Sequence, residues 1–158
     1  MVTRIVEESG TPEKQLILEL TESCKVSEPN GLRDDFEYFK NMGINMALDD
    51  FGTEYSSIAL LRKLKPQWIK IDHTFVRSIQ DDEMDQAILE YIMNLSKQTR
   101  IKVCVEGVEN KEILSVVQTY KPELLQGYYY SRPCPAEEFS KKYFNGKDKT
   151  GSYGCLKK

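Results

Sequence analysis

Five short apolar runs, each ending at a charged or polar side chain, constrain the fold of this 158-residue chain more than any other feature. The runs are 16–18 before Glu19, 46–48 before Asp49 and Asp50, 68–69 before Lys70, 103–105 before Glu106, and 124–125 before Gln126. Strands buried on both faces of a parallel sheet form such continuous apolar stretches. The residues that end the runs therefore predict the carboxyl edge of a parallel sheet, where α/β proteins place their functional groups.

Helical periodicity between these runs predicts helices over 32–42, 56–63, 82–98, 110–120 and 135–144. Each gap between successive strand ends has room for one crossover helix, as a right-handed βα repeat requires. Two architectures fit this pattern, a five-stranded open sheet and part of an eight-stranded barrel. Because every strand offers a polar residue at the same end, we favour the barrel, although five strands cannot close one.

Composition narrows the function classes. A net charge of −3 provides no basic field for duplex nucleic acid, and no apolar run is long enough to span a bilayer, so we expect a cytoplasmic chain. Cys24, Cys104, Cys134 and Cys155 are too widely spaced for a paired metal motif, and we expect reduced thiols. The single histidine, His73, excludes a multi-histidine metal site and a Ser-His-Asp triad.

The strand-end residues point to carboxylate and lysine chemistry. Carboxylates that converge from several strands repel one another unless a cation lies between them, and a divalent cation or a pair of cations is the economical candidate. Asp49 and Asp50 are adjacent, so they reach one site only if the strand turns at its end. Lys70 and Asp72 alternate along one strand and are expected to share a face.

The motifs at these strand ends are similar to those of a known family. They are LILELTES (16–23), ALDDFGTEYSS (47–57), WIKID (68–72), VEGVE (105–109) and LLQGYYYSRP (124–133). In this order they resemble EAL-domain phosphodiesterases, which cleave cyclic di-GMP to linear pGpG. The resemblance implies a partial (β/α)8 TIM-like barrel of about five βα units, with residues 1–145 as the C-terminal portion of an EAL domain and 146–158 as a flexible tail. The Glu-Ala-Leu motif and a metal-binding Asn, which the family carries upstream, are absent.

The resemblance also implies roles for individual residues. Glu19, Asp49, Asp50 and Glu106 would hold two divalent cations, Mg²⁺ or Mn²⁺. Lys70, Glu109 and Gln126 would be catalytic, and Glu22 would stabilise the loop after the second strand. Glu54 stands where the family has glycine. A glutamate there would cost about 1 kcal/mol if φ is positive, and its negative charge would weaken the binding of an anionic dinucleotide.

Several alternatives remain open. Lys70 could form only a structural salt bridge with Asp72 or Glu106, and His73 is expected to be a capping or surface residue. The chain could be a degenerate EAL module that binds cyclic di-GMP or a protein without catalysis, or a receiver-like phospho-acceptor. If it is an incomplete barrel, we expect exposed edge strands, little hydrolase activity alone, and association as a homodimer or with the missing N-terminal part.

Overall fold

The computed structural model describes residues 2–21, 29–53 and 57–144, and within them it forms one parallel sheet flanked by helices. The strands are β1 (Ile17–Thr21), β2 (Asn45–Phe51), β3 (Trp68–Ile71), β4 (Lys102–Val105) and β5 (Leu124–Leu125). All neighbouring pairs are parallel, and the strands follow one another across the sheet in chain order. A doubly wound sheet would reverse that order at a switch point, so this sheet is an arc of a singly wound barrel.

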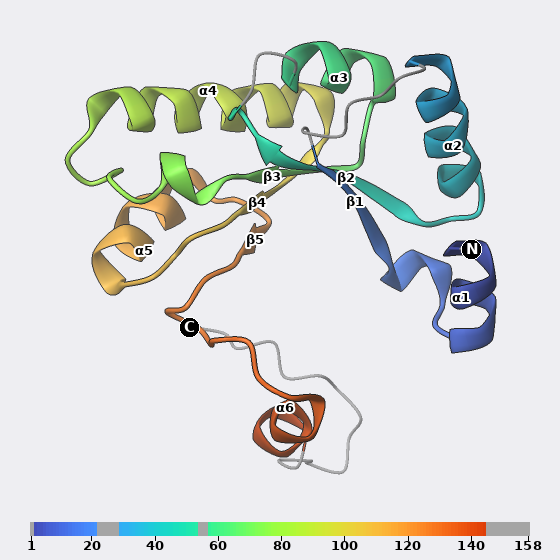
Figure 1. Cartoon of the computed structure of the whole chain (residues 1–158). Coiled ribbons are helices and arrows are strands. Elements are labelled where there is room, and N and C mark those ends of the chain that lie inside the picture. Colours follow the sequence, from blue (N-terminus) through green and yellow to red (C-terminus); the bar gives the residue numbers. More distant parts are fainter. Residues whose placement is uncertain (1, 22–28, 54–56, 145–158) are drawn as a thin grey trace.

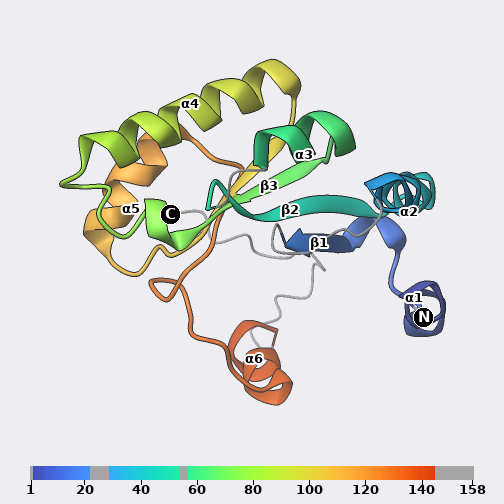
Figure 2. The ribbon, with the colours of Figure 1, turned by 45° about the horizontal axis from the view of Figure 1, so that its top comes forward.

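Helices alternate with the strands as the sequence predicts. They are α1 (Val2–Ser9), α2 (Pro29–Asn41), α3 (Ser57–Leu64), α4 (Glu83–Thr99), α5 (Lys111–Val117) and α6 (Ala136–Tyr143). Three short 3₁₀ helices, η1 (Glu13–Gln15), η2 (His73–Phe75) and η3 (Gln118–Tyr120), complete the described elements. Figures 1 and 2 show α2, α3 and α4 on the same face of the sheet, whereas α6 lies apart from them.

The helix boundaries agree with the sequence expectations to within a few residues. The Asp82 side chain accepts hydrogen bonds from the backbone of Met84 and Asp85, which begins α4. Asn110 begins α5 in the same way, through a 2.8 Å bond from the Ile113 amide. The helix predicted over 110–120 is divided, because its last turn tightens into the 3₁₀ helix η3.

The core lies between the sheet and the helices on its outer face. Every second side chain of a strand points into this core. Those with at most 1% exposure include Ile69, Ile71, Val103 and Val105. They pack in one cluster with helix residues that include Phe36, Leu61, Leu89 and Ile113. The opposite face carries the intervening residues, among them Glu19, Asp49, Lys70 and Cys104, so the polar groups belong to the face that a barrel would enclose.

The two edge strands of the sheet are β1 and β5. On the inner face, Ile17 at one edge is 39% exposed and Leu124 at the other is 46% exposed. These are the open edges expected of a barrel segment. None of the described helices is long and apolar enough to cross a bilayer. The tail predicted over 146–158 lies outside the described residues.

Candidate active site

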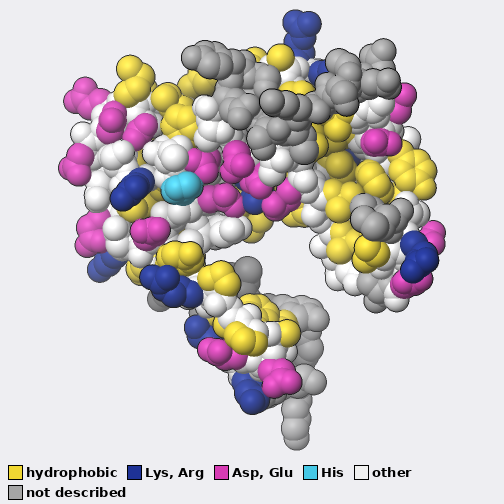
Figure 3. All heavy atoms as spheres, viewed as in Figure 1, with side chains coloured by type: hydrophobic (Ala, Val, Ile, Leu, Met, Phe, Trp, Pro, Cys, Tyr) yellow, Lys and Arg dark blue, Asp and Glu magenta, His cyan; other side chains and the backbone are white. Residues whose placement is uncertain are grey.

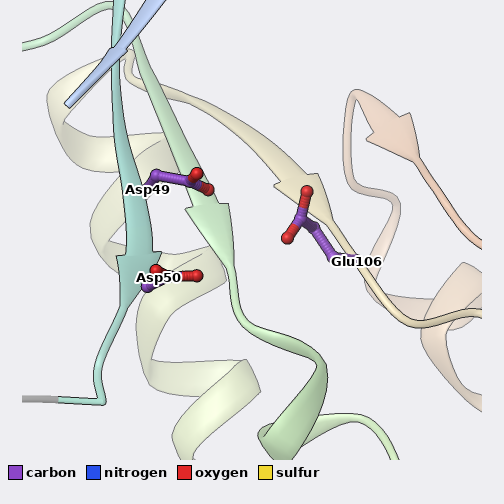
Figure 4. A group of neighbouring side chains, drawn as sticks. All are labelled: Asp49, Asp50 and Glu106. Atoms are coloured by element: carbon purple, nitrogen blue, oxygen red, sulfur yellow. The ribbon is translucent and has the colours of Figure 1, made fainter. Parts of the chain in front are cut away.

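A β-bulge at the end of β2 brings two adjacent aspartates to one side of the sheet. Leu48 pairs with Ile69 and Phe51 pairs with Ile71, so Asp49 and Asp50 together oppose the single residue Lys70. Asp50 has φ +53°, a left-handed conformation that aspartate tolerates better than most residues. Figure 4 shows that both carboxylates leave β2 in the same direction, towards β3.

Glu106 completes a group of three carboxylates with these aspartates. It directly follows β4, and its amide donates to the carbonyl of Ile71 at 3.1 Å, which continues the ladder to the strand end. One carboxylate oxygen from each of Asp49, Asp50 and Glu106 lies within 4.8 Å of the other two. In Figure 4 the Glu106 carboxylate reaches back from β4 towards those of β2, and Figure 3 shows acidic side chains gathered in the middle of this face.

Lys70 lies at the centre of the acidic groups and is largely buried. Its Nζ atom is 2.8 Å from Glu19 Oε2 and 2.9 Å from both Asp49 Oδ1 and Glu106 Oε1. Burial alone would lower the pKa of Lys70, but the contacts with these three carboxylates outweigh it and raise the pKa above its ordinary value. Lys70 is therefore a fixed positive charge, contributed by β3 and held by acids from β1, β2 and the end of β4.

The same carboxylates fit a hard divalent cation. Within the described part of the chain, Asp49 Oδ1 is buried without a well-aligned hydrogen bond, and it lies 2.9 Å from Lys70 Nζ. Burial, and then the charges of Asp49 and Asp72, raise the pKa of Asp50. Three convergent carboxylates with spare oxygen lone pairs are the donor set that Mg²⁺ or Mn²⁺ prefers. Glu19 contacts Lys70 but is not part of the group of three.

Asp72 shares the end of β3 with Lys70 but has a different role. Its carboxylate accepts hydrogen bonds from the amide and hydroxyl of Thr74 at 2.9 and 2.6 Å, and it contacts His73 Nδ1 at 2.9 Å. Although burial would raise it, these contacts lower the pKa of Asp72. Asp72 begins η2, and Lys70 pairs with Glu106 rather than with Asp72. His73, with a side chain that is 61% exposed, is the surface residue that the sequence predicted.

Glu109 lies beside the carboxylate group rather than within it. It is exposed and lines a separate pocket of about 270 Å³ with residues that include His73 and Arg77. The turn before it is fixed by Gly107, which has φ +75° and whose missing Cβ would lie 2.5 Å from His73 Cβ. Only glycine allows the turns after β3 and β4 to approach so closely.

Gln126 is held in place by its backbone. Its amide donates to the carbonyl of Val105 at 2.9 Å, and its carbonyl accepts from Val108 at 3.1 Å, while the side chain is exposed. The next residue, Gly127, has no room for a side chain, because a Cβ atom would lie 2.1 Å from the Val108 carbonyl oxygen. Glu22 and Glu54 lie outside the described residues.

Cys104 is a site residue to which the sequence analysis gave no role. It is buried in register with Lys70, and burial, followed by the charge of Glu106, raises the pKa of its thiol to about 11. Strand alternation was the available signal, since Cys104 shares the inner face with Lys102 while Val103 and Val105 point into the core. Cys104 and Cys134 are free thiols, as predicted, and the other two cysteines lie outside the described residues.

Comparison with known proteins identifies the family. The EAL domain model matches residues 1–133. The cyclic di-GMP phosphodiesterase NbdA of Pseudomonas aeruginosa is 34% identical over 145 residues, which cover 90% of this chain and 18% of NbdA. The chain thus spans less than a fifth of that relative's length.

Solved structures agree with the family model. The EAL domain of Mycobacterium smegmatis DcpA has a TM-score of 0.85 and 29% identity, over 93% of this chain and 66% of that one. The manganese and cyclic di-GMP complex of Klebsiella pneumoniae BlrP1 has a TM-score of 0.78 and 31% identity, over 84% of this chain and 34% of that one. The predicted partial barrel is confirmed, and the chain belongs to the EAL domain family.

Proposed function

We propose that the carboxyl edge of this sheet is the divalent-metal site of a cyclic di-GMP phosphodiesterase. The observation that carries the proposal is the convergence of Glu19, Asp49 and Glu106 on Lys70 at 2.8–2.9 Å, with Asp50 in the same group of carboxylates as Asp49 and Glu106. Two further facts support it. The relative NbdA is named a cyclic di-GMP phosphodiesterase, and BlrP1 has been solved with cyclic di-GMP and either manganese or calcium.

The proposed roles follow from the position of each group. Asp49, Asp50 and Glu106 would hold one cation, Glu19 would contribute to a second, and Mg²⁺ or Mn²⁺ would supply an activated water and neutralise phosphate charge. Lys70 offers its ammonium group where negative charge would develop on the phosphate, and it would orient the attacking water. Gln126 would hydrogen-bond water or substrate, and Glu109 would act at the margin of the site.

The open edges limit the proposed activity of the chain by itself. In the described ranges no strand pairs with the outer edge of β1 or of β5, and Ile17 and Leu124 are exposed on the inner face. A substrate bound at the carboxyl edge of the sheet would contact protein on only part of its surface. Its reacting groups would be positioned less well, and water would be excluded less completely. We therefore propose that full turnover needs the open sheet to be completed, either by the remaining strands of an EAL barrel or by association with a second copy.

The test is hydrolysis of cyclic di-GMP by the purified chain with Mn²⁺, followed as release of pGpG. We expect slow turnover that Lys70→Met abolishes, with Lys97→Met as the control because Lys97 is an exposed residue of α4. Turnover at equal rates in the native chain and the Lys70→Met variant would contradict the proposed role of the site.

A second candidate is an EAL module that binds cyclic di-GMP without cleaving it. The observation that favours it is the residue Glu54, which follows the DDFG motif at a position where the EAL family has glycine. Calorimetry with cyclic di-GMP and excess Ca²⁺ separates the candidates. Binding with Ca²⁺ but no pGpG with Mn²⁺ supports the binding module, and absence of binding counts against both.

A further inference from the structure

The structure holds a second, larger pocket that the acidic site does not explain. It has a volume of about 650 Å³, within the range of pockets that bind small organic ligands. Its lining comes from α3 and α4 and from the segments that lead into β2, β3 and β4, so it lies at the amino end of the sheet. Figures 1 and 2 show α3 and α4 side by side over the sheet.

The interior of this pocket is mainly apolar. Leu61 and Pro66 form buried parts of the wall, Leu95 is half-buried, and Ile58 and Tyr91 are 60% and 57% exposed. The floor is held by Gln67, whose side-chain oxygen accepts from the Met46 amide at 2.9 Å and whose carbonyl accepts from the Lys102 amide at 2.9 Å. Such a wall favours a ligand with an alkyl or aromatic part.

Three basic side chains border the same pocket, and its lining contains no acidic residue. They are Arg62 from α3, Lys65 after it and Arg100 after α4. Lys102 also contributes to the lining, but its side chain is on the inner face of the sheet, where Nζ lies 5.0 Å from the centroid of the Trp68 ring. Among the described residues, none of the three forms an ion pair with a carboxylate. In a chain with a net charge of −3, this is a local concentration of uncompensated positive charge.

Helix ends alone do not account for these cations. α3 and α4 both end at the pocket, and each C-terminus carries a partial charge of about −0.5, which favours a basic neighbour. Two such ends supply about −1 against three cations, so the pocket keeps an excess of positive charge. Lys65 and Arg100 take positive φ values of 47° and 61° directly after their helices.

We propose that this pocket binds a small amphiphilic anion, whose apolar body lies between α3 and α4 and whose single acidic group meets the basic side chains. Charge complementarity argues for this occupant, since the walls favour an apolar ligand body and the three cations favour a negatively charged head group. The proposal is independent of the metal site, which lies at the carboxyl end of the strands.

Calorimetric titration of the full chain with decanoate in EDTA tests the proposal, with decylammonium as the probe of opposite charge. We expect one decanoate per chain with a Kd below about 1 mM, and binding of decylammonium at least about tenfold weaker. Arg62→Glu should weaken decanoate binding about tenfold, because it changes the local charge by two units. Lys97→Glu, the same reversal on α4 outside the pocket lining, should change it less than about twofold.

Arg62 and Lys97 are both exposed, so these variants are expected to fold, and circular dichroism checks it. Equal binding of the two probes, equal effects of the two variants, or no binding of decanoate would overturn the proposal. Sedimentation supplies a further decisive outcome. If the chain forms a dimer that Arg62→Glu dissociates and decanoate does not, the pocket is covered by a second copy and not by an anion. Because no step needs metal or cyclic di-GMP, each result is separate from the fate of the proposed hydrolase site.

Discussion

Replacing Lys70 by methionine removes the charge at the centre of the acidic group while keeping a side chain of similar size. Glu19, Asp49 and Glu106 then lose their shared partner at 2.8–2.9 Å. At such distances each pair has a Coulomb energy of about 6 kcal/mol with an effective dielectric constant near 20. The desolvation of Lys70, whose side chain is 11% exposed, offsets much of that energy.

The three pairs do not contribute equally. The Glu19 side chain is 43% exposed, so water screens its pair and we assign it a few tenths of a kcal/mol. The side chains of Asp49 and Glu106 are only 16% and 17% exposed, so their pairs with Lys70 contribute most of the stabilisation. Loss of one partner from a buried pair costs about 3–5 kcal/mol, and because the site is open on one side we expect about 3 kcal/mol for Lys70→Met in EDTA.

Urea unfolding followed by the fluorescence of Trp68, the single tryptophan, measures this change. Lys97→Met is the control and should stay within about 0.5 kcal/mol of the native chain. Mn²⁺ should restore part of the stability lost by Lys70→Met, since a cation that binds the folded state neutralises the carboxylates that the lysine leaves behind. If Lys70→Met is as stable as the control in EDTA, or if Mn²⁺ has no effect on it, the electrostatic account of the site is wrong.

Three other substitutions have outcomes that the structure fixes. Asp50→Gly should raise the free energy of unfolding by about 1 kcal/mol in EDTA, because it relieves a φ of +53° and removes a carboxyl group of raised pKa. The same substitution should weaken Mn²⁺ binding in a fluorescence or calorimetric titration. Gly127→Ala should lower the free energy of unfolding in urea by about 2 kcal/mol or more, because its Cβ would lie 2.1 Å from the Val108 carbonyl oxygen. Gly31→Ala in α2, whose Cβ would have nothing within 4 Å, should be neutral or stabilising. Asp72→Asn should cost about 1 kcal/mol above pH 3.8 and progressively less below it, because a carboxylate with lowered pKa stabilises the fold above its unfolded pKa and loses that effect as it protonates; a difference that does not shrink in acid unfolding curves would contradict this.

Much of the fold could be predicted because its signals are local. The apolar runs before Asp49, Lys70 and Glu106 are strands buried by helices. The helices predicted to begin at Asp82 and Asn110 do begin there, and both residues are of types that cap helices. The strand order needed a further argument. A polar residue at the end of every strand favoured a barrel over an open sheet, and the sequential order of β1 to β5 agrees with it.

The geometry of the site was only partly accessible from sequence. A turn that brings Asp49 and Asp50 together was required, but the bulge that produces it depends on the pairing of β2 with β3. The choice of Glu106 over Asp72 as a partner of Lys70 depends on Thr74, which occupies the Asp72 carboxylate through a local turn. Cys104 was assigned no role because its burial beside Lys70 arises from the register of β3 with β4.

Titration of the purified chain with Mn²⁺, followed by the electron paramagnetic resonance of the free ion, tests the central claim most directly. If Asp49, Asp50 and Glu106 hold a cation, the native chain binds Mn²⁺ and Asp49→Asn weakens that binding at least about tenfold, since it removes a charged ligand. Asp34→Asn, at an exposed position of α2, should bind as the native chain does. Equal Mn²⁺ affinity for the native chain and the Asp49→Asn variant would contradict the claim.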